Sequence, residues 1–436
     1  MASFPRKTRS VCPVCLKNIP AKLEQREDGS VFLSKECPEH GAFSADVWRG
    51  NVDFDTWTQC AQPLGELGTQ CPQNCGLCPE HESGSCCVLL EVTKRCDLRC
   101  AFCFADGGQQ EPDMPLEQMK KAIDRIRTLC GKPLLQLSGG EPTLRDDLPE
   151  LVRYAKEVGC SYVQVNTNGL RLARDVEYAK ALAKAGLDIV FLQFDGTRQE
   201  IYEKLRGKPL LVDKIRALDV CAALGLGVTL VPTVVPGVNT ENLGELVAFA
   251  KERVPGVRGI HFQPVSYFGR CPEGSRVRYT LDDLMQDLSG QVGIPLDSFM
   301  PSQCDHPLCG FHANFLVEPT GNLRPLSNIT HSAQRKCGAS HNREYVARHW
   351  RRYPQEAAPQ GVLSDEMDFD TFLYCLRHRS LTLSSMAFQD AGNLNIERLH
   401  RCSLHVYAEG KIKPFCAHYL TCFYESDETG TMDREG

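Results

Sequence analysis

A spacing of three cysteines, C-x3-C-x2-C, occurs twice in the first quarter of this chain and constrains its fold more than any other feature. "CPQNCGLC" covers residues 71–78, and "CDLRCAFC" covers residues 96–103. Thiolates at such short spacing are typical of metal sites, and a closed structural site has four ligands. The second copy, Cys96, Cys100 and Cys103, supplies three, so the identity of its fourth ligand decides between a structural centre and a reactive one.

The cysteine content of the whole chain supports metal binding. Of 23 cysteines in 436 residues, 12 fall within residues 1–103. The N-terminus is basic but is not followed by an apolar segment, so no secretory signal is predicted and a cytoplasmic location is expected. Clustered cysteines in a large cytoplasmic protein favour metal ligation over disulfides. Cys130, Cys160 and Cys221 occur in apolar contexts and are expected to be packing residues.

Charge and hydropathy argue against two kinds of partner. The net charge of −6, from 49 basic and 55 acidic residues, gives no electrostatic case for nucleic acid or an anionic membrane. The longest uncharged run, residues 220–240, is interrupted by glycine and proline. It therefore predicts a helix end, a turn and a buried strand, and no transmembrane segment is expected.

Residues 1–55 contain two metal knuckles on either side of a polar, alternating stretch that predicts a β-hairpin. The ligands have C-x2-C and C-x2-H spacing: Cys12, Cys15, Cys37 and His40. Such a tetrahedral Cys3His set suits zinc, or a mononuclear iron in a rubredoxin-like setting. Because all four positions are filled, we expect this site to stabilise a small module and to take no part in a reaction.

Residues 56–87 form a second cysteine-rich segment. The first C-x3-C-x2-C copy plus one more cysteine would make an all-cysteine set that fits an auxiliary iron–sulfur cluster, with a second zinc site as the alternative. Cys60, Cys86 and Cys87 are the candidates for the last ligand, and the expected one is Cys86. The predicted set is therefore Cys71, Cys75, Cys78 and Cys86.

Strand-like and helix-like segments alternate from residue 88 to about residue 290. Strand patterns cover residues 88–93, 133–142, 162–169, 187–196, 227–235 and 259–266. Helical periodicity covers residues 115–130, 146–158, 174–185, 198–206, 212–224 and 242–252. This order predicts an α/β fold, a partial (β/α)6 barrel with cysteine-rich N-terminal and C-terminal metal-binding extensions. The cysteine loop, "GGEP", "NTNG" and "FDG" all follow strands, and the carboxyl ends of parallel strands meet at one edge.

The cysteine loop after the first strand, with Phe102 before its last cysteine, and "SGGEP" after the second strand resemble the radical S-adenosylmethionine (SAM) superfamily over residues 88–265. The resemblance implies that Cys96, Cys100 and Cys103 hold a [4Fe–4S] cluster whose fourth iron binds SAM. Reductive cleavage of SAM would give a 5′-deoxyadenosyl radical that abstracts hydrogen from an unactivated carbon.

Polar and glycine residues at the strand ends are the expected contacts to SAM or substrate. Glycines let backbone approach the methionine amino group, a carboxylate accepts its hydrogen bonds, and asparagines suit ribose hydroxyls. An aromatic ring would support the adenine. The expected residues are Phe102, Gly139, Gly140, Glu141, Asn166, Asn168, Gln193 and Asp195.

A narrower resemblance covers nearly the whole chain. The "CPVC…CPEHG" knuckles, "CGLCPEH", "VQVNTNGLRLA" and the terminal "RC…PFC" segment are similar to archaeal radical SAM proteins related to tetraether lipid synthase, a group that includes methyltransferases of a hydroxymethyl dihydropterin. The resemblance implies two auxiliary [4Fe–4S] clusters, the second in residues 291–425. Its ligands would be Cys304, Cys309, Cys402 and Cys416, with buried free cysteines as the alternative. His306 is expected to face solvent.

Three functions are compatible with these patterns. The leading hypothesis is a radical SAM enzyme that forms a C–C bond or C-methylates a lipid-chain or pterin-like substrate, with a low-potential electron donor such as ferredoxin or flavodoxin. The alternatives are a peptide-modifying radical SAM enzyme and a non-enzymatic iron–sulfur electron carrier. A short polar pocket with aromatic rings would exclude the lipid. Residues 330–360 are expected to be a solvated helix or a mobile connection, and residues 426–436 a disordered tail.

Overall fold

The computed structural model describes residues 4–423 except 60–70, 73–74, 77, 110, 273, 275, 303, 319, 327–338, 351–352 and 354–367. Cys60 and the expected disordered tail therefore lie outside the described residues. Among the described helices, none has the length and apolar character needed to cross a membrane.

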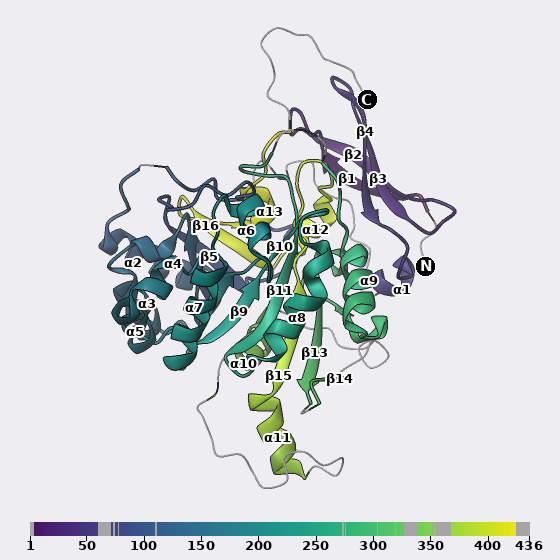
Figure 1. Cartoon of the computed structure of the whole chain (residues 1–436). Helices are drawn as coiled ribbons and strands as arrows, with labels where there is room; N and C mark the ends of the chain where they lie inside the picture. The colour runs from purple at the N-terminus through teal and green to yellow at the C-terminus, as the bar shows by residue number, and fades with distance from the viewer. Residues whose placement is uncertain are drawn as a thin grey trace.

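A four-stranded antiparallel sheet forms the N-terminal part (purple in Figure 1). Its strands pair in chain order: β1 (Arg6–Val11), β2 (Asn18–Gln25), β3 (Val31–Cys37) and β4 (Gly41–Trp48). Buried and exposed residues alternate along β2, as expected of a strand with one covered face. The predicted hairpin is confirmed as β2–β3. The short helix α1 (Phe54–Thr58) follows the sheet.

Six parallel strands make the centre of the main sheet and confirm the predicted α/β fold. They are β5 (Cys87–Thr93), β6 (Leu134–Gly139), β7 (Val163–Thr167), β8 (Ile189–Gln193), β9 (Gly227–Val231) and β11 (Val257–Pro264). Each strand lies beside its predecessor in the chain, and the short β10 (Thr233–Val234) pairs with β11. The carboxyl ends of the six strands therefore form one continuous edge.

Helices connect these strands and cover the outer face of the sheet (Figure 1). They are α2 (Leu116–Cys130), α3 (Leu148–Glu157), α4 (Leu170–Arg174), α5 (Val176–Lys184), α6 (Gln199–Arg206), α7 (Leu211–Ala223) and α8 (Leu243–Lys251). All six predicted helical ranges are confirmed, with α4 as an additional short helix. α6 ends at Gly207, whose φ of 71° is left-handed and favours glycine at this position.

The C-terminal region extends the sheet at both edges. On one side β15 (Ser380–Ser385) pairs in parallel with β11, and β13 (Phe311–Val317), β12 (Met300–Pro301) and β14 (Leu323–Pro325) continue outward. On the other side β16 (Leu404–Ala408) pairs in parallel with β5 and antiparallel with β17 (Lys411–Pro414). The outermost strands do not pair with each other in the part of the chain that is described, so the sheet is an open, partial barrel.

The remaining helices include one that corrects an expectation. They are α9 (Leu281–Val292), α10 (Ala339–Trp350), α11 (Phe369–His378), α12 (Ile396–His400) and α13 (Phe415–His418). α10 packs against β9, β11 and β15, and the Trp350 ring lies 4.9 Å from the Phe191 ring. The expectation of a solvated or mobile segment is therefore wrong for residues 339–350, because the apolar side of this basic helix is turned to the sheet.

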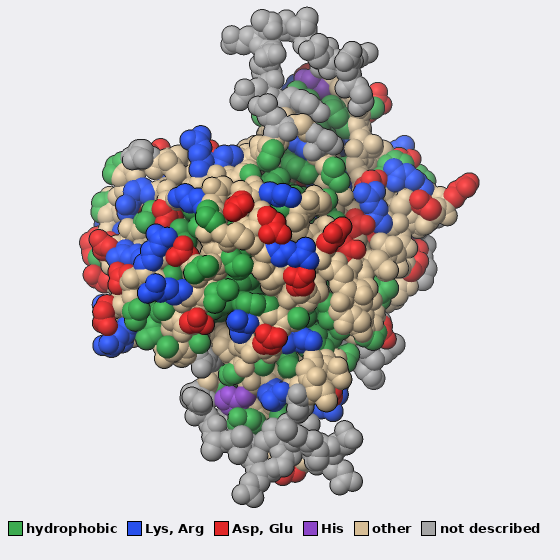
Figure 2. Space-filling model, viewed as in Figure 1, with side chains coloured by type: hydrophobic (Ala, Val, Ile, Leu, Met, Phe, Trp, Pro, Cys, Tyr) green, Lys and Arg blue, Asp and Glu red, His purple; other side chains and the backbone are tan. Residues whose placement is uncertain are grey.

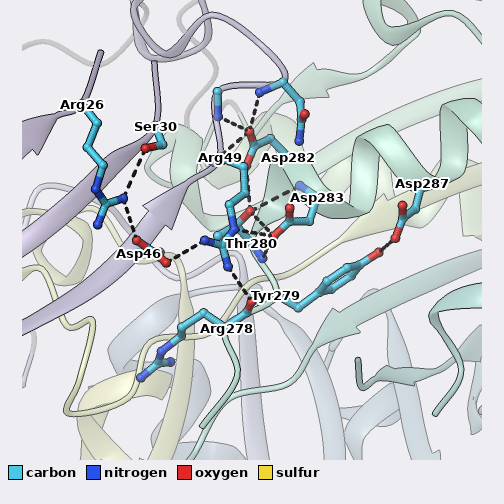
Figure 3. A network of polar contacts seen from close by, with 12 residues as sticks. Arg26, Ser30, Asp46, Arg49, Arg278, Tyr279, Thr280, Asp282, Asp283 and Asp287 are labelled. Carbon is cyan, nitrogen blue, oxygen red and sulfur yellow. Dashed lines mark hydrogen bonds and ion pairs between the residues drawn. The ribbon is translucent and has the colours of Figure 1, made fainter. Parts of the chain in front are cut away.

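A network of polar contacts joins the N-terminal sheet to α9 (Figure 3). The buried carboxylate of Asp282 accepts hydrogen bonds from the backbone N–H groups of Arg49, Gly50 and Asn51, at 2.9–3.1 Å. Thr280 caps the same helix through a capping box. Over the face seen in Figure 2, acidic and basic side chains are interspersed, in keeping with the small net charge.

Candidate active site and metal centres

The second C-x3-C-x2-C copy forms a loop directly after β5. Cys100 is buried, and Cys96 and Cys103 are partly exposed. Arg270 fixes the loop: its backbone forms two hydrogen bonds with Cys103, at 2.9 and 3.0 Å, and its Nε donates to the Cys100 carbonyl at 2.9 Å. The three thiols are thus held on one short, ordered turn.

Gly139 and Gly140 pack directly against the start of this loop. The Gly140 N–H donates to the Thr93 carbonyl at 2.8 Å, and the Glu141 N–H donates to the Arg95 carbonyl at 2.7 Å. A Cβ on either glycine would lie 2.2 Å from one of these carbonyl oxygens, and Gly139 has a φ of +124°. Only glycine allows so close an approach, so the predicted glycine pair and the cysteine loop form one unit.

The Glu141 carboxylate braces the ends of β6 and β7. It accepts hydrogen bonds from Thr143, from the Thr167 hydroxyl at 2.6 Å and from the Asn168 N–H at 2.6 Å, and burial raises its pKa. The Asn168 side chain donates in turn to Asp97 at 2.7 Å. Glu141 and Asn168, which the sequence predicted as contacts to SAM or substrate, therefore hold the local backbone in place.

Gln193 and Asp195, at the end of β8, are both engaged with buried cations. Arg206 forms a two-pronged ion pair with Asp195, at 2.5 and 2.7 Å, and also reaches the Cys100 thiol. Lys214 donates to the Asn168 carbonyl and to Gln193 Oε1, the latter at 3.3 Å. Arg206 therefore contacts the Cys100 thiol, and Lys214 places a second positive charge near the same thiol.

Sequence reasoning missed both cations, although a pattern could have revealed them. Lys214 stands on the same buried side of α7 as Ala217, Leu218 and Cys221, where the helical period calls for an apolar residue. Buried cations are retained where a negative group needs them. A [4Fe–4S] cluster with thiolate ligands is such a group, so the donor set and its electrostatics fit the cluster. Burial, with smaller contributions from Glu141, Cys100 and Asp97, raises the pKa of Cys96 to about 12.

The N-terminal knuckle is a compact four-ligand group. The ligand atoms of Cys12, Cys15, Cys37 and His40 all lie within 4.8 Å of one another. His40 Nδ1 is 3.6 Å from Cys12 Sγ and 3.4 Å from Cys37 Sγ. These separations match tetrahedral ligands around one ion with bonds of about 2.0–2.3 Å. The four residues fit a single bound metal ion.

The remaining cysteines divide differently from the predicted sets. The Cys86 thiol contacts the Cys304 thiol, which also accepts from the Ser403 hydroxyl at 3.4 Å, whereas Cys71 contacts Cys75 and lies 3.5 Å from His400. Cys309, Cys402 and Cys416 lie near one another. The C-terminal set Cys304, Cys309, Cys402 and Cys416 is thus gathered in one region, with Cys86 beside it.

His306 lies beside this C-terminal set and corrects an expectation. It is 5% exposed, and its Nδ1 accepts from the Leu308 N–H at 3.1 Å to cap the short turn η4 (Pro307–Cys309). The expectation that it faces solvent is therefore wrong, because the cap holds the ring inside the loop.

A cavity lies on the inner side of the sheet. Its walls come from β5–β8, β11, β16 and α10 and from the loop after β5, and they combine carboxamides with aromatic rings: Gln136, Gln164, Asn166, Gln263, Phe104, Phe191, His261, Trp350, Phe388 and Phe415. Phe104 directly follows Cys103, so the cavity reaches the cysteine loop. Trp350 of α10 lies in its wall, beside Phe191 and His261.

The polar groups of the cavity are incompletely paired. Gln164 donates to Gln136 Oε1 at 2.6 Å, but Gln164 Oε1 and Asn166 Oδ1 accept no hydrogen bond within the described part of the chain. Both oxygens are buried. Unpaired buried acceptors are rare, so they point to a ligand that donates hydrogen bonds. Burial lowers the pKa of His261 to about 4, so this ring is neutral at pH 7.

Comparisons with known proteins agree with this geometry. Residues 90–250 match the radical SAM superfamily, and residues 4–49 match the HMPTM N-terminal zinc ribbon domain. A 7,8-dihydro-6-hydroxymethylpterin dimethyltransferase of Methanocaldococcus jannaschii is 33% identical over 99% of this chain and 96% of its own length.

More distant relatives share the central region. A Fe-coproporphyrin III synthase of Methanosarcina barkeri is 35% identical over 42% of this chain and 45% of its own length. A GTP 3′,8-cyclase of Limosilactobacillus fermentum is 29% identical over 48% and 64%. The crystal structure of Streptococcus suis SuiB bound to S-adenosylmethionine has a TM-score of 0.41 and 18% identity, covering 48% of this chain and 47% of that one.

Proposed function

Because this chain belongs to the radical SAM superfamily, and within it to the family of 7,8-dihydro-6-hydroxymethylpterin dimethyltransferase, we propose that it abstracts hydrogen from a pterin-like heterocycle and C-methylates that ring system or its substituent. The observation that carries the proposal is the cavity between the cysteine loop and Trp350, with its carboxamides and aromatic rings.

The residues of the strand-end edge have separate roles in this proposal. Cys96, Cys100 and Cys103 would hold the cluster, and Gly139 and Gly140 would border SAM. With SAM bound and the cluster reduced by a donor such as ferredoxin or flavodoxin, cleavage of SAM would supply the 5′-deoxyadenosyl radical. The same proposal includes contacts of SAM or the substrate with Phe102, Asn166, Asn168, Gln193 and Asp195.

Arg206 and Lys214 would offset the negative charge of the thiolates and of the SAM carboxylate. Both side chains are buried, and Arg206 reaches the Cys100 thiol. Attraction between opposite charges is strong where water is excluded.

The cavity supports a heterocycle over a lipid chain. A pterin has a planar ring that can stack on aromatic side chains and an edge with N–H donors that can pair with buried acceptors such as Gln164 Oε1 and Asn166 Oδ1. A saturated chain would leave these acceptors unpaired, at about 1–3 kcal/mol each.

We propose the following organisation for the whole chain. Residues 1–55 form a zinc-binding module, residues 56–87 and 291–425 carry one auxiliary [4Fe–4S] cluster each, and residues 88–290 form the radical SAM partial barrel. The match of residues 4–49 to a zinc ribbon supports zinc over iron in the first knuckle.

The test uses the carbon–hydrogen bonds of the candidate substrate. In 7,8-dihydro-6-hydroxymethylpterin, C–H bonds occur at ring carbon C7 and at the hydroxymethyl carbon. Substrate deuterated at these carbons is incubated anaerobically with reconstituted full-length protein, reductant and SAM. We expect deuterium in 5′-deoxyadenosine, measured by mass spectrometry, and none with Cys100→Ala. Unlabelled 5′-deoxyadenosine from wild-type protein that shows no binding of the pterin would refute the proposal.

A further inference from the structure

The two C-x3-C-x2-C copies differ in the groups that lie next to their cysteines, where a fourth cluster ligand would be. We propose that Cys71, Cys75 and Cys78 bind an iron–sulfur cluster whose fourth ligand is the imidazole of His400. This inference goes beyond the proposed reaction and stands or fails independently of the substrate. It replaces Cys86 in the set expected from the sequence.

His400 reaches the first cysteine copy. Its Nε2 lies 3.5 Å from Cys71 Sγ. The ligand atoms of Cys71, Glu80 and His400 all lie within 4.8 Å of one another. The Cys71 thiol also contacts the Cys75 thiol. The imidazole is therefore within reach of any metal centre that Cys71 and Cys75 hold.

The site is buried and its backbone is fixed. Cys71, Cys75 and His400 are 5%, 8% and 5% exposed. The His400 carbonyl accepts from the Glu82 N–H at 2.8 Å, and the Cys71 carbonyl accepts from the Asn18 side chain at 2.5 Å. Segments from the N-terminal sheet, the cysteine-rich loop and α12 thus hold the ligands together, as a structural metal centre requires.

The three cysteines that the sequence offered as the last ligand are engaged elsewhere or lie outside the described residues. Cys86 contacts the Cys304 thiol, and its N–H donates to the Ser403 carbonyl at 2.9 Å. Cys87 points into the cavity, where its thiol donates to Gln136 Oε1 at 3.4 Å. Cys60 is outside the described part of the chain, so the variant Cys60→Ser is included in the experiment.

His400 would also explain why this copy does not bind SAM. In the second copy the glycine pair Gly139–Gly140 lies against the cysteine loop, whereas in the first copy an imidazole and the Glu80 carboxylate lie there. A filled fourth position leaves no iron for ligand exchange. Because neutral imidazole replaces an anionic thiolate, the reduction potential should be higher than that of an all-cysteine cluster.

The experiment detects whether a histidine nitrogen is bound to the cluster. Full-length protein with Cys96, Cys100 and Cys103 changed to alanine is reconstituted with iron and sulfide, which removes the SAM-binding cluster from the spectra. Pulsed electron paramagnetic resonance of the reduced protein should show a nitrogen hyperfine coupling that changes when histidine is labelled with ¹⁵N. His400→Ala should abolish that coupling.

Further variants separate ligation from folding. In the same background, His400→Cys should retain the iron content, lose the coupling and shift the reduction potential to more negative values. His81→Ala is the matched control, because His81 lies in the same loop, 2.8 Å from the Cys402 carbonyl. The inference is overturned if the coupling survives in His400→Ala, if His81→Ala removes it, if Cys60→Ser and not His400→Ala removes the cluster, or if zinc occupies the site.

Discussion

The ammonium group of Lys214 lies fully buried at the carboxyl ends of β7 and β8, beside Asn168 and Gln193. Burial lowers its pKa to about 8. An unfolded lysine has a pKa of about 10.4, so between these values the unfolded chain binds more protons than the folded chain. The free energy of unfolding of metal-free protein should therefore rise with pH in this window, by about 3 kcal/mol for Lys214 alone.

Lys214→Met should remove this part of the pH dependence. Urea unfolding of metal-free wild-type and variant protein at pH values near 7 and near 10 measures it as a difference, which cancels the titration of the buried thiols. The matched control is Lys180→Met, because the Lys180 side chain is 45% exposed. Equal pH dependence in all three proteins would contradict the prediction. The Lys214 charge destabilises the fold below pH 8, and in the proposed function it offsets the negative charge of the thiolates.

At the scale of the element, the bound ion and the N-terminal sheet should depend on each other. The knuckle joins the β1–β2 turn to the β3–β4 turn, at the ends of four short strands. Removal of the ion by a chelator should increase amide hydrogen exchange across residues 6–48 and leave exchange in β6–β8 unchanged, because metal binding supplies folding free energy to small modules.

Hydrogen exchange followed by mass spectrometry tests this, with Cys37→Ser as the comparison. The variant should show the increased exchange before chelation and no further change after it. Unchanged exchange of residues 6–48 in chelated wild-type protein would show that the sheet is held by its contacts with α9, including those of Asp282, and not by the ion.

Elements with a clear hydrophobic period were predictable from the sequence, and the exceptions have physical causes. The six β/α units follow from apolar strands and amphipathic helices. β15, "SLTLSS", was not predicted because serine and threonine alternate with leucine, yet all six residues are buried. Two of its hydroxyls pair with residues distant in the chain, Ser384 with His261 at 2.9 Å and Thr382 with Asn314 at 2.9 Å, whereas Ser385 Oγ has no partner among the described residues. Partners so distant in the chain leave no local pattern.

Contacts between residues far apart in the chain also limit how much of the site can be predicted from the sequence. The cysteine loop and the glycine pair were found because each is a local motif next to a strand. His400 lies 329 residues from Cys71, and the helical period that marks Lys214 as buried does not say which group it approaches. Only the packed structure brings these groups to the thiols.

At the scale of the molecule, the cavity is assembled from segments of nearly the whole chain, and α10 forms part of its wall. The Trp350 ring lies 4.9 Å from Phe191 and 5.9 Å from His261. If the pterin occupies this cavity, Trp350→Ala should weaken its binding by about tenfold, since an aromatic pair contributes about 0.5–1.5 kcal/mol beyond the area it buries.

SAM cleavage in the absence of substrate should be unchanged in this variant, because Trp350 packs against Phe191 and His261 of the sheet. Pterin binding by equilibrium dialysis and 5′-deoxyadenosine formation therefore respond differently to one substitution. Phe369→Ala, at an aromatic residue that is 72% exposed, should alter neither quantity. Equal pterin affinity in Trp350→Ala and wild-type protein would place the substrate outside the cavity, whereas parallel loss of both quantities would show that α10 supports the fold of the cysteine loop.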